Sequence, residues 1–156
     1  MQIRPFRPGD EPALWAVFHS AVHTTAANDY TPEQRAAWSP PDPDPAAWAR
    51  RMQGIAPFVA EEDGRIVGYA DVQADGYIDH FFVAGGQARR GIGAALMRRI
   101  HDEASARGLA ALRADVSITA RPFFAHWGFR VVREQAVTVR GVTMTNFAMR
   151  KDLAPA

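Results

Sequence analysis

Apolar positions along the chain recur first at helical spacing and then in short strand-like runs. Leu14, Val17 and Phe18 fall on one face of a predicted helix. The Asp-Gly pairs at 63–64 and 75–76 favour tight hairpin turns and separate three runs rich in β-branched and aromatic residues. We therefore expect three antiparallel strands, at Pro57 to Glu61, Ile66 to Val72 and Tyr77 to Val83.

Caps, prolines and glycines mark the other elements. Asp10 with Pro12 predicts a helix start, and Gly91 and Gly108 enclose a longer amphipathic helix. Because that helix intervenes, the next strand should run parallel to the strand that ends at Val83. The further predicted elements are strands at Gln2 to Phe6, Leu109 to Val116, Phe129 to Val139 and Val142 to Arg150, and helices at Pro32 to about Trp38, Ala46 to Met52 and Thr119 to Gly128. Together they describe a mixed α/β domain on one central sheet.

The composition indicates a single domain and narrows the class of ligand. With 156 residues, 47% of them apolar, we expect one domain over 1–156 with its own core. A formal charge of +1 argues against broad binding to nucleic acid or membranes. The absence of cysteine excludes disulfides, thiolate metal sites and a cysteine nucleophile. We expect a cytoplasmic protein, because neither a signal-peptide pattern nor a membrane-span pattern is present.

A loop rich in glycine and arginine leads into the helix after Gly91. A helix start presents unpartnered backbone N–H groups and a partial positive charge, so it binds anions. Gly91 and Gly93 let a phosphate approach closely, and the basic pairs at 89–90 and 98–99 add the local charge that suits a pyrophosphate. A P-loop would need Gly-Lys-Ser/Thr, and a dinucleotide fingerprint a third glycine at Leu96; neither fits. A turn that merely caps the helix is the simpler alternative.

Two motifs in a fixed order resemble the GNAT superfamily of acetyl-CoA-dependent N-acetyltransferases. They are Arg-Arg-Gly-Ile-Gly-Ala at 89–94 and Phe-Phe-Ala-His-Trp-Gly-Phe at 123–129. The segments 30–35, 115–124 and 145–150 are most similar to the bacterial YafP-like branch. The resemblance implies an α/β, GNAT-type acyl-CoA N-acyltransferase fold: a central mixed, mostly antiparallel sheet flanked by helices, with a splay between the fourth and fifth strands.

The resemblance also implies acetyl-CoA as acyl donor, an amine of a small molecule or peptide as acceptor, and no metal. In this family the glycine loop holds the pyrophosphate, and backbone N–H groups near Phe81 to Val83 stabilise the oxyanion. The loop position usually held by Gln or Arg is Ala88 here, and Gln87 lies one residue early. The implied coenzyme-binding residues are Phe81, Phe82, Val83, Gln87, Ala88, Arg89, Arg90, Gly91, Ile92, Gly93, Ala94, Ser117 and Phe124.

Two side chains near the start of the fourth strand are candidates for the general base. The family's base sits there, close to Asp79, although the best-matched position itself holds Tyr77. His80 would need no tuning to act near neutral pH. Strand alternation predicts that Asp79 and Tyr77 share one face of the strand and that His80 lies on the opposite face. A water chain without a single base is the third alternative, and ordinary structural roles for Asp79 and His80 are the fourth.

The family's usual proton donor to the thiolate, a tyrosine, is replaced by Phe124, which has no proton to donate. Ser117, at the end of the preceding strand, lies near in family geometry and is a candidate to bind the coenzyme or donate a proton. Helical periodicity predicts that His126 points away from Phe124. Water is the alternative proton donor. The alternative function is a non-catalytic acyl-CoA-binding module that acts as a sensor or regulator.

The acceptor amine is the least determined part of the site. By family geometry Tyr30, Gln34 and Trp38 lie in the connection that covers the acceptor cleft, and Tyr77 is a further candidate contact. His19 and His23 have a spacing found in metal sites, but no third ligand is evident, so a pair that is exposed at the surface or satisfied by structural partners is favoured. The oligomeric state is expected to be a monomer or a homodimer.

Overall fold

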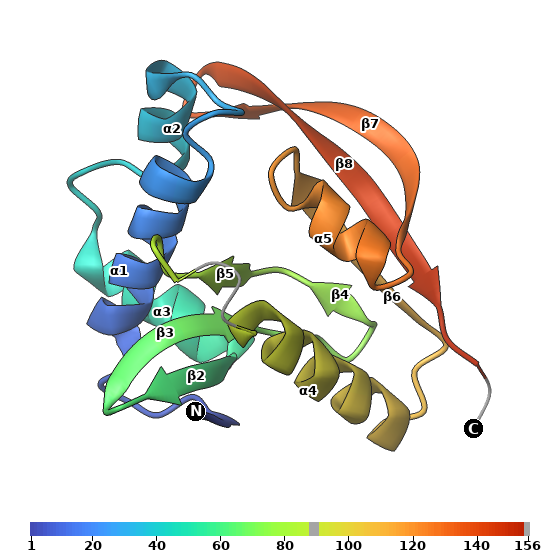
Figure 1. Cartoon of the computed structure of the whole chain (residues 1–156). Helices are drawn as coiled ribbons and strands as arrows, with labels where there is room; N and C mark the ends of the chain where they lie inside the picture. Colours follow the sequence, from blue (N-terminus) through green and yellow to red (C-terminus); the bar gives the residue numbers. More distant parts are fainter. Residues whose placement is uncertain (88–90, 155–156) are drawn as a thin grey trace.

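The computed structural model describes residues 1–87 and 91–154. Its elements, in chain order, are β1 (Gln2–Pro5), α1 (Glu11–Ser20), the π-helical turn η1 (Ala21–Thr25), α2 (Pro32–Trp38), α3 (Pro45–Ile55), β2 (Phe58–Glu62), β3 (Arg65–Ala70), β4 (Tyr77–Ile78), β5 (Phe81–Val83), α4 (Ile92–Ala106), β6 (Ala111–Ser117), α5 (Arg121–His126), β7 (Arg130–Val139) and β8 (Val142–Asp152) (Figure 1). These bounds follow the predicted elements closely, apart from the fourth strand.

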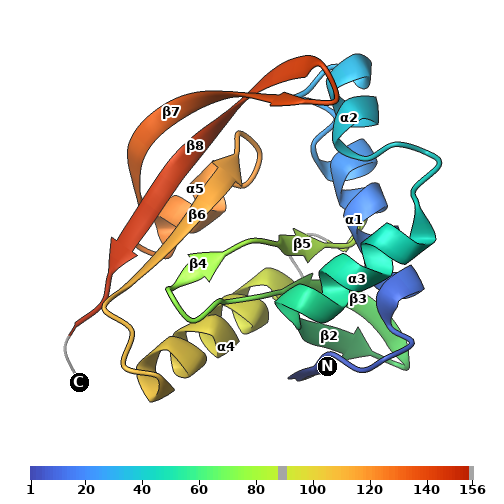
Figure 2. The ribbon, with the colours of Figure 1, turned by 180° about the vertical axis from the view of Figure 1, so that it is seen from behind.

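The sheet is divided into two halves of four strands each. One half has the order β1-β2-β3-β5 and the other the order β4-β6-β8-β7. Every pairing is antiparallel except that of β4 with β6, which is parallel. The chain passes from one half to the other between β4 and β5, and beyond this point β5 and β6 diverge (Figures 1 and 2). The predicted fold class, including the splay, is confirmed.

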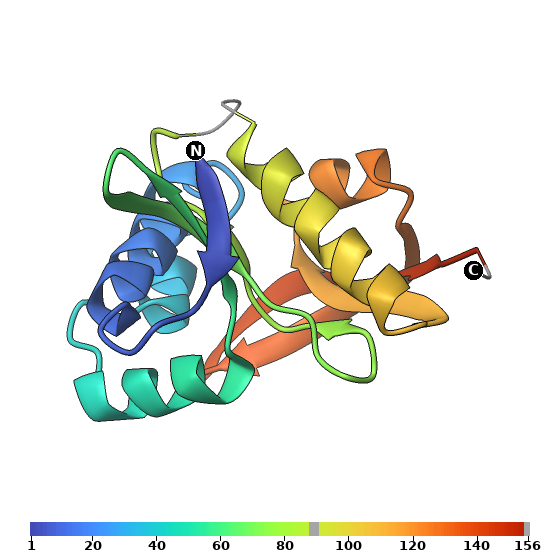
Figure 3. The same ribbon diagram turned by 90° about the horizontal axis from the view of Figure 1, so that it is seen from below.

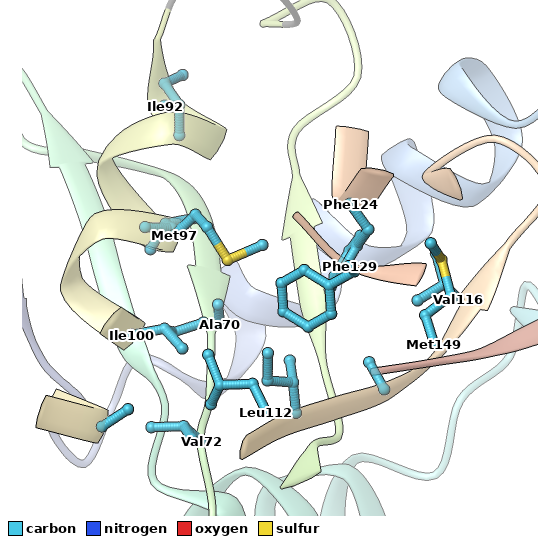
Figure 4. Close-up of a cluster of buried hydrophobic side chains, with 14 of the residues drawn as sticks. Ala70, Val72, Ile92, Met97, Ile100, Leu112, Val116, Phe124, Phe129 and Met149 are labelled. Carbon is cyan, nitrogen blue, oxygen red and sulfur yellow. The ribbon is translucent and has the colours of Figure 1, made fainter. Parts of the chain in front are cut away.

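Helices cover both faces of the first half of the sheet. The helices α1 and α3 pack on one face, whereas α4 lies across the other (Figure 3). Gly68 of β3 allows this close approach, because a Cβ there would lie 3.0 Å from Ile92 and 3.1 Å from Leu96. The main core lies between α4, α5 and the two halves of the sheet, and it includes Met97, Leu112 and Phe129 (Figure 4).

The prediction of one continuous strand from Tyr77 to Val83 was wrong. The Gln73 N–H donates to the Tyr77 carbonyl, and the Asp71 N–H donates to the His80 carbonyl. The two residue steps from Asp71 to Gln73 therefore face the three residue steps from Tyr77 to His80. One extra residue on one strand defines a β-bulge. The buried Asp71 carboxylate accepts hydrogen bonds from the backbone N–H groups of both Asp79 and His80, and this holds the extra residue in place.

The bulge changes which side chains share a face, because one inserted residue reverses the alternation that follows. Four of the seven side chains line one cavity: Tyr77, Asp79, His80 and Phe82. The other three pack in the α4 core: Ile78, Phe81 and Val83. The expectation that Asp79 and His80 lie on opposite faces is therefore wrong, because both face the same cavity.

Asp10 occupies the N-cap position of α1 as predicted, but its side chain does not cap the helix. Its carboxylate instead pairs with the buried Arg4 at 2.9 Å, and Arg4 also bonds Glu61 at 2.6 Å. These charge-assisted bonds tie β1 to the start of α1 and to β2. Within residues 1–87 and 91–154, no helix is long and apolar enough to cross a membrane.

Candidate active site

Two cavities meet where the sheet splays. The larger, which we call the aromatic pocket, has a volume of about 990 Å³, and the smaller, which we call the α4–α5 cleft, has about 740 Å³. Trp38, Phe82 and Ser117 line both, so these three side chains form the boundary between them. A ligand in each cavity would therefore meet its neighbour at the end of β6, beside Ser117.

The α4–α5 cleft contains the start of α4. Gly91 precedes the helix in the left-handed conformation, with φ of 80°. Its carbonyl accepts the Ala95 N–H at 3.0 Å, and as a glycine it has no side chain with which to cap the N–H groups of the first turn. Such a helix start attracts anions. The Ile92 side chain is buried in the core, so only its backbone N–H can serve a ligand.

Most of the predicted coenzyme-binding residues are brought together in this cleft. They are Phe81, Phe82, Val83, Gln87, Gly91, Gly93, Ala94, Ser117 and Phe124. Ala88, Arg89 and Arg90 lie outside the described residues. Arg98, one of the basic residues noted in the sequence, also lines the cleft, whereas Arg99 stacks over Phe58 instead. His126 lines the cleft as well, which helical periodicity did not predict.

The register of β3 with β5 determines which backbone groups face the splay. Phe82 lies opposite Tyr69 and midway between His80 and Ala84. The His80 carbonyl and the Ala84 N–H both form backbone hydrogen bonds with β3 or its extension. In an antiparallel pair such hydrogen-bonded positions alternate with positions that face outward. The N–H groups of Phe81 and Val83 are therefore directed away from β3, into the opening between β5 and β6. Donors in this orientation suit an extended ligand or a carbonyl oxygen.

Asp79 and His80 are joined by Arg51 of α3. The Arg51 Nη2 donates to both carboxylate oxygens of Asp79, at 3.1 and 3.0 Å, and its Nε donates to His80 Nε2 at 3.2 Å. Because Nε2 must accept here, we assign the His80 proton to Nδ1, which lies 2.9 Å from the Tyr69 hydroxyl. The Asp79 side chain is 25% exposed, whereas His80 is only 8% exposed.

Burial lowers the pKa of His80 to about 4; the nearby Asp79 opposes this shift and Arg51 adds to it. The imidazole is therefore neutral near pH 7, and both of its nitrogens are engaged. A neutral imidazole with so low a pKa is a weak proton acceptor. Of the two predicted base candidates, Asp79 is the more accessible to a ligand in the aromatic pocket.

Phe124 is buried, with 3% of its surface exposed, and it forms part of the wall between the core and the cleft. Its ring packs against Phe81 and Phe129, with centroids 5.5 and 5.0 Å away. Ser117 has a hydroxyl at the junction of the two cavities, and its Oγ accepts a hydrogen bond from the Ala120 N–H at 3.0 Å. Because Oγ is the acceptor in this bond, its own proton can be donated to another group.

The predicted acceptor residues have different environments. Trp38 and Tyr77 line the aromatic pocket with accessible surface. Tyr30 also lines it, but its buried hydroxyl donates to the Thr145 carbonyl and accepts from the Ile118 N–H, which ties β8 to the end of β6. Gln34 lines neither described cavity, because its amide forms a capping box with Thr31 and bonds the Thr143 carbonyl.

Five charged residues of the aromatic pocket were missed in the sequence: Asp42, Asp44, Arg51, Asp115 and Arg140. Arg51 gave no local signal, because its partners lie 28 and 29 residues away. Asp115 could have been found, since strand alternation places it on the same face of β6 as Ser117. Its carboxylate accepts from the Tyr77 hydroxyl and from Gln135, both at 2.9 Å.

The paired histidines of α1 and η1 have structural partners. His19 Nδ1 lies 2.7 Å from the Ser39 hydroxyl, and His23 Nε2 lies 2.8 Å from the Ser39 carbonyl. His19 also stacks on Trp15. Among the residues that the structure describes, no group of three or more His, Asp or Glu side chains is arranged to hold a metal.

Comparisons with known proteins agree with this geometry. The model of the acetyltransferase (GNAT) domain matches residues 26–152. The uncharacterized N-acetyltransferase YafP of Escherichia coli K12 is 37% identical over 150 residues, covering 96% of this chain and 95% of YafP.

Solved structures show the same fold. A GCN5-related N-acetyltransferase from Rhodopseudomonas palustris superimposes with a TM-score of 0.92 at 31% identity, covering 97% of this chain and 95% of that one. The PaiA N-acetyltransferase from Thermoplasma acidophilum, solved with coenzyme A, has a TM-score of 0.75 at 17% identity, covering 97% and 98%. The matched domain and the extent of the YafP similarity show that this chain belongs to the GNAT acetyltransferase superfamily, in its YafP-like branch.

Proposed function

We propose that this protein transfers the acetyl group of acetyl-CoA to a primary amine of a small molecule or peptide. The observation that carries the proposal is the meeting of the two cavities at Trp38, Phe82 and Ser117. A two-substrate transfer needs two adjacent sites that place the reacting atoms within contact distance. The membership of the GNAT superfamily supports the same reaction class.

The residues of the α4–α5 cleft fit coenzyme A. The start of α4 offers the N–H groups of its first turn, at Ile92, Gly93 and Ala94, for phosphate oxygens. Arg98 adds a guanidinium, and Phe123 and Phe124 provide apolar surface. The outward-facing backbone of Phe81 and Val83 suits the amides of the pantetheine arm, as an added strand would. PaiA, which shares the fold, was solved with coenzyme A.

When bound, acetyl-CoA supplies the thioester whose C–S bond is exchanged for a C–N bond. In our proposal Asp79 accepts the proton that the amine loses, because it is the accessible carboxylate of the pair held by Arg51. The N–H groups of Phe81 and Val83 stabilise charge on the carbonyl oxygen. The Ser117 hydroxyl, at the boundary of both cavities, passes a solvent proton to the sulfur.

Calorimetric titration with acetyl-CoA, followed by a free-thiol assay against a panel of amines, tests the proposal. We expect coenzyme binding in the micromolar to millimolar range and release of coenzyme A above background with at least one amine. No coenzyme binding would reject the proposed function. Tight binding without release across peptide N-termini, lysines, polyamines, aminoglycosides and aromatic amines would favour the non-catalytic module instead.

A further inference from the structure

The walls of the aromatic pocket are rich in aromatic side chains. Three of the four tryptophans of the chain line it: Trp15, Trp38 and Trp48. Phe18, Tyr77 and Phe82 extend the aromatic surface. Planar apolar groups bind such walls by burial and by offset or edge-to-face ring contacts. The walls therefore favour a ligand with a flat apolar body over one that is polar along its whole length.

Negatively charged side chains outnumber positively charged ones on these walls. Four carboxylates line the pocket, at Asp42, Asp44, Asp79 and Asp115, against two guanidinium groups, at Arg51 and Arg140. Arg51 is already paired with Asp79 through both oxygens. Arg140 donates one of its hydrogen bonds to the Ala37 carbonyl. The balance leaves the pocket with an excess of negative charge, which disfavours ligands that carry a carboxylate.

Asp115 is the carboxylate best placed to hold a cationic group beside the reaction centre. It stands two residues before Ser117 on the same face of β6. Tyr77 and Gln135 each donate to a different one of its oxygens, so its orientation is fixed while further lone pairs remain. Among the residues described, no salt bridge joins Asp115 to a cation. It is thus a preorganised acceptor that a ligand's ammonium group can complete.

We infer that the acceptor is a singly charged amine on an aromatic body, with its ammonium group held at Asp115 and its ring against the tryptophans. This inference rests on the proposed function and narrows its acceptor to one chemical class. The aromatic walls add cation–π attraction for the same ammonium group. Before transfer the ammonium group loses one proton to solvent, and Asp79 accepts the second proton when the neutral nitrogen attacks the thioester carbonyl; Asp115 binds the substrate and takes no part in the bond exchange.

Tryptophan fluorescence gives a binding test that does not depend on turnover. We would titrate the full-length protein with 2-phenylethylamine, ethylamine, phenylalanine and spermidine, in the absence of acetyl-CoA. We expect 2-phenylethylamine to bind at least about tenfold more tightly than ethylamine, which lacks the ring, and than phenylalanine, which adds a carboxylate. Equal or tighter binding of phenylalanine or spermidine would overturn the inference.

Two matched variants test whether the ammonium group of the ligand binds at Asp115. Asp115→Asn removes the charge but keeps the size of the side chain and one accepting oxygen. We expect it to weaken 2-phenylethylamine binding by about tenfold. Asp102→Asn removes the same charge from an exposed position on α4, outside both cavities, and should leave binding unchanged. Unchanged binding in Asp115→Asn would remove Asp115 from the site and overturn the inference.

Coenzyme binding to the same samples separates this inference from the proposed function. If acetyl-CoA binds and only aliphatic or anionic amines release coenzyme A, the proposed function stands and the inferred acceptor class is wrong. If acetyl-CoA does not bind, the proposed function is wrong, and the fluorescence titrations still decide whether the pocket selects aromatic monoamines.

Discussion

The Asp71 carboxylate accepts the backbone N–H of His80, and this bond fixes the point at which the fourth strand of the sheet breaks. The same carboxylate accepts the N–H of Asp79 at 3.3 Å and the amide of Gln73 at 2.7 Å. Asp71 is itself buried, with 1% of its surface exposed. It thus holds Asp79 and His80 on one face, and it also fixes the register that directs Phe81 N–H into the splay.

Replacing Asp71 by alanine should therefore impair both stability and turnover. Two backbone donors lose their acceptor, which costs about 1–3 kcal/mol in the free energy of unfolding for a buried group. Acetyl transfer should fall because Asp79 is no longer held in place. Urea denaturation and the free-thiol assay measure the two effects. Asp71→Asn, which retains one accepting oxygen, should recover part of both losses, and wild-type behaviour in Asp71→Ala would show that the bulge does not depend on this carboxylate.

Local sequence signals were sufficient to predict the ordinary elements. Pro32 and Gly108 mark the ends of helices because a ring-locked φ suits a first turn and a positive φ suits a helix end. The turn at Arg140 and Gly141, where both residues have positive φ, lies where the sequence placed it. The ordered motifs around Gly91 and Phe124 supplied the fold, which local periodicity alone would not distinguish from other α/β arrangements.

The site depends on contacts between residues that are distant in sequence, and these gave no local signal. The run from Tyr77 to Val83 alternates well enough to be predicted as one strand. It is broken where the distant Asp71 carboxylate binds the N–H groups of Asp79 and His80. Likewise Arg51 reaches Asp79 from a helix 28 residues earlier. Single-sequence patterns carry the preferences of neighbours along the chain, whereas these interactions are set by tertiary packing.

The buried His80 should make folding sensitive to mild acid. Its pKa is lowered to about 4 in the folded state, mainly by burial, from an ordinary value of 6.5. A lowered histidine pKa contributes stability that is complete above pH 6.5 and is lost as the pH falls toward 4, at up to about 1.4 kcal/mol per pH unit. Urea denaturation at several pH values measures this slope.

His80→Gln should flatten the dependence of unfolding free energy on pH between 6.5 and 4, because the titrating group is removed. His126→Gln, at an exposed position, serves as the matched histidine replacement. If wild type and His80→Gln show parallel curves through this window, then protonation of His80 is not what opposes folding in acid.

The two ends of α4 offer a matched test of the phosphate site. Gly91 and Gly108 have φ of 80° and 66°, and a Cβ at either would meet open space. Each Gly→Ala change should cost about 1–2 kcal/mol in stability, because L side chains disfavour this conformation. Only Gly91→Ala should also weaken acetyl-CoA binding, since Gly108 lies at the other end of the helix. Calorimetry measures the affinities, and an equal loss for both variants would argue against a phosphate site at Gly91.

Asp79→Asn should lower turnover by about 10²–10⁴-fold, the usual contribution of a positioned general base. Acetyl-CoA affinity should change little, because Asp79 lines the aromatic pocket and not the α4–α5 cleft. The acidic limb of the pH–rate profile should disappear. Steady-state kinetics across pH, with Asp102→Asn as the control, measures these effects, and a wild-type rate would transfer the role to His80 or to water.

Phe124→Tyr tests how the site works without the tyrosine that the GNAT resemblance implies at this position. The ring is packed against Phe81 and Phe129, so an added hydroxyl must find a partner in the cleft or remain buried without one. An unpartnered hydroxyl costs about 1–3 kcal/mol in stability. We expect turnover to rise modestly at most, because in our proposal the Ser117 hydroxyl already passes a proton to the thiolate. A large loss of turnover in Phe124→Tyr, with coenzyme binding weakened in parallel, would mean that Phe124 acts by shaping the cleft. The turnover rate of Ser117→Ala would then show whether Ser117 or solvent delivers the proton to the thiolate.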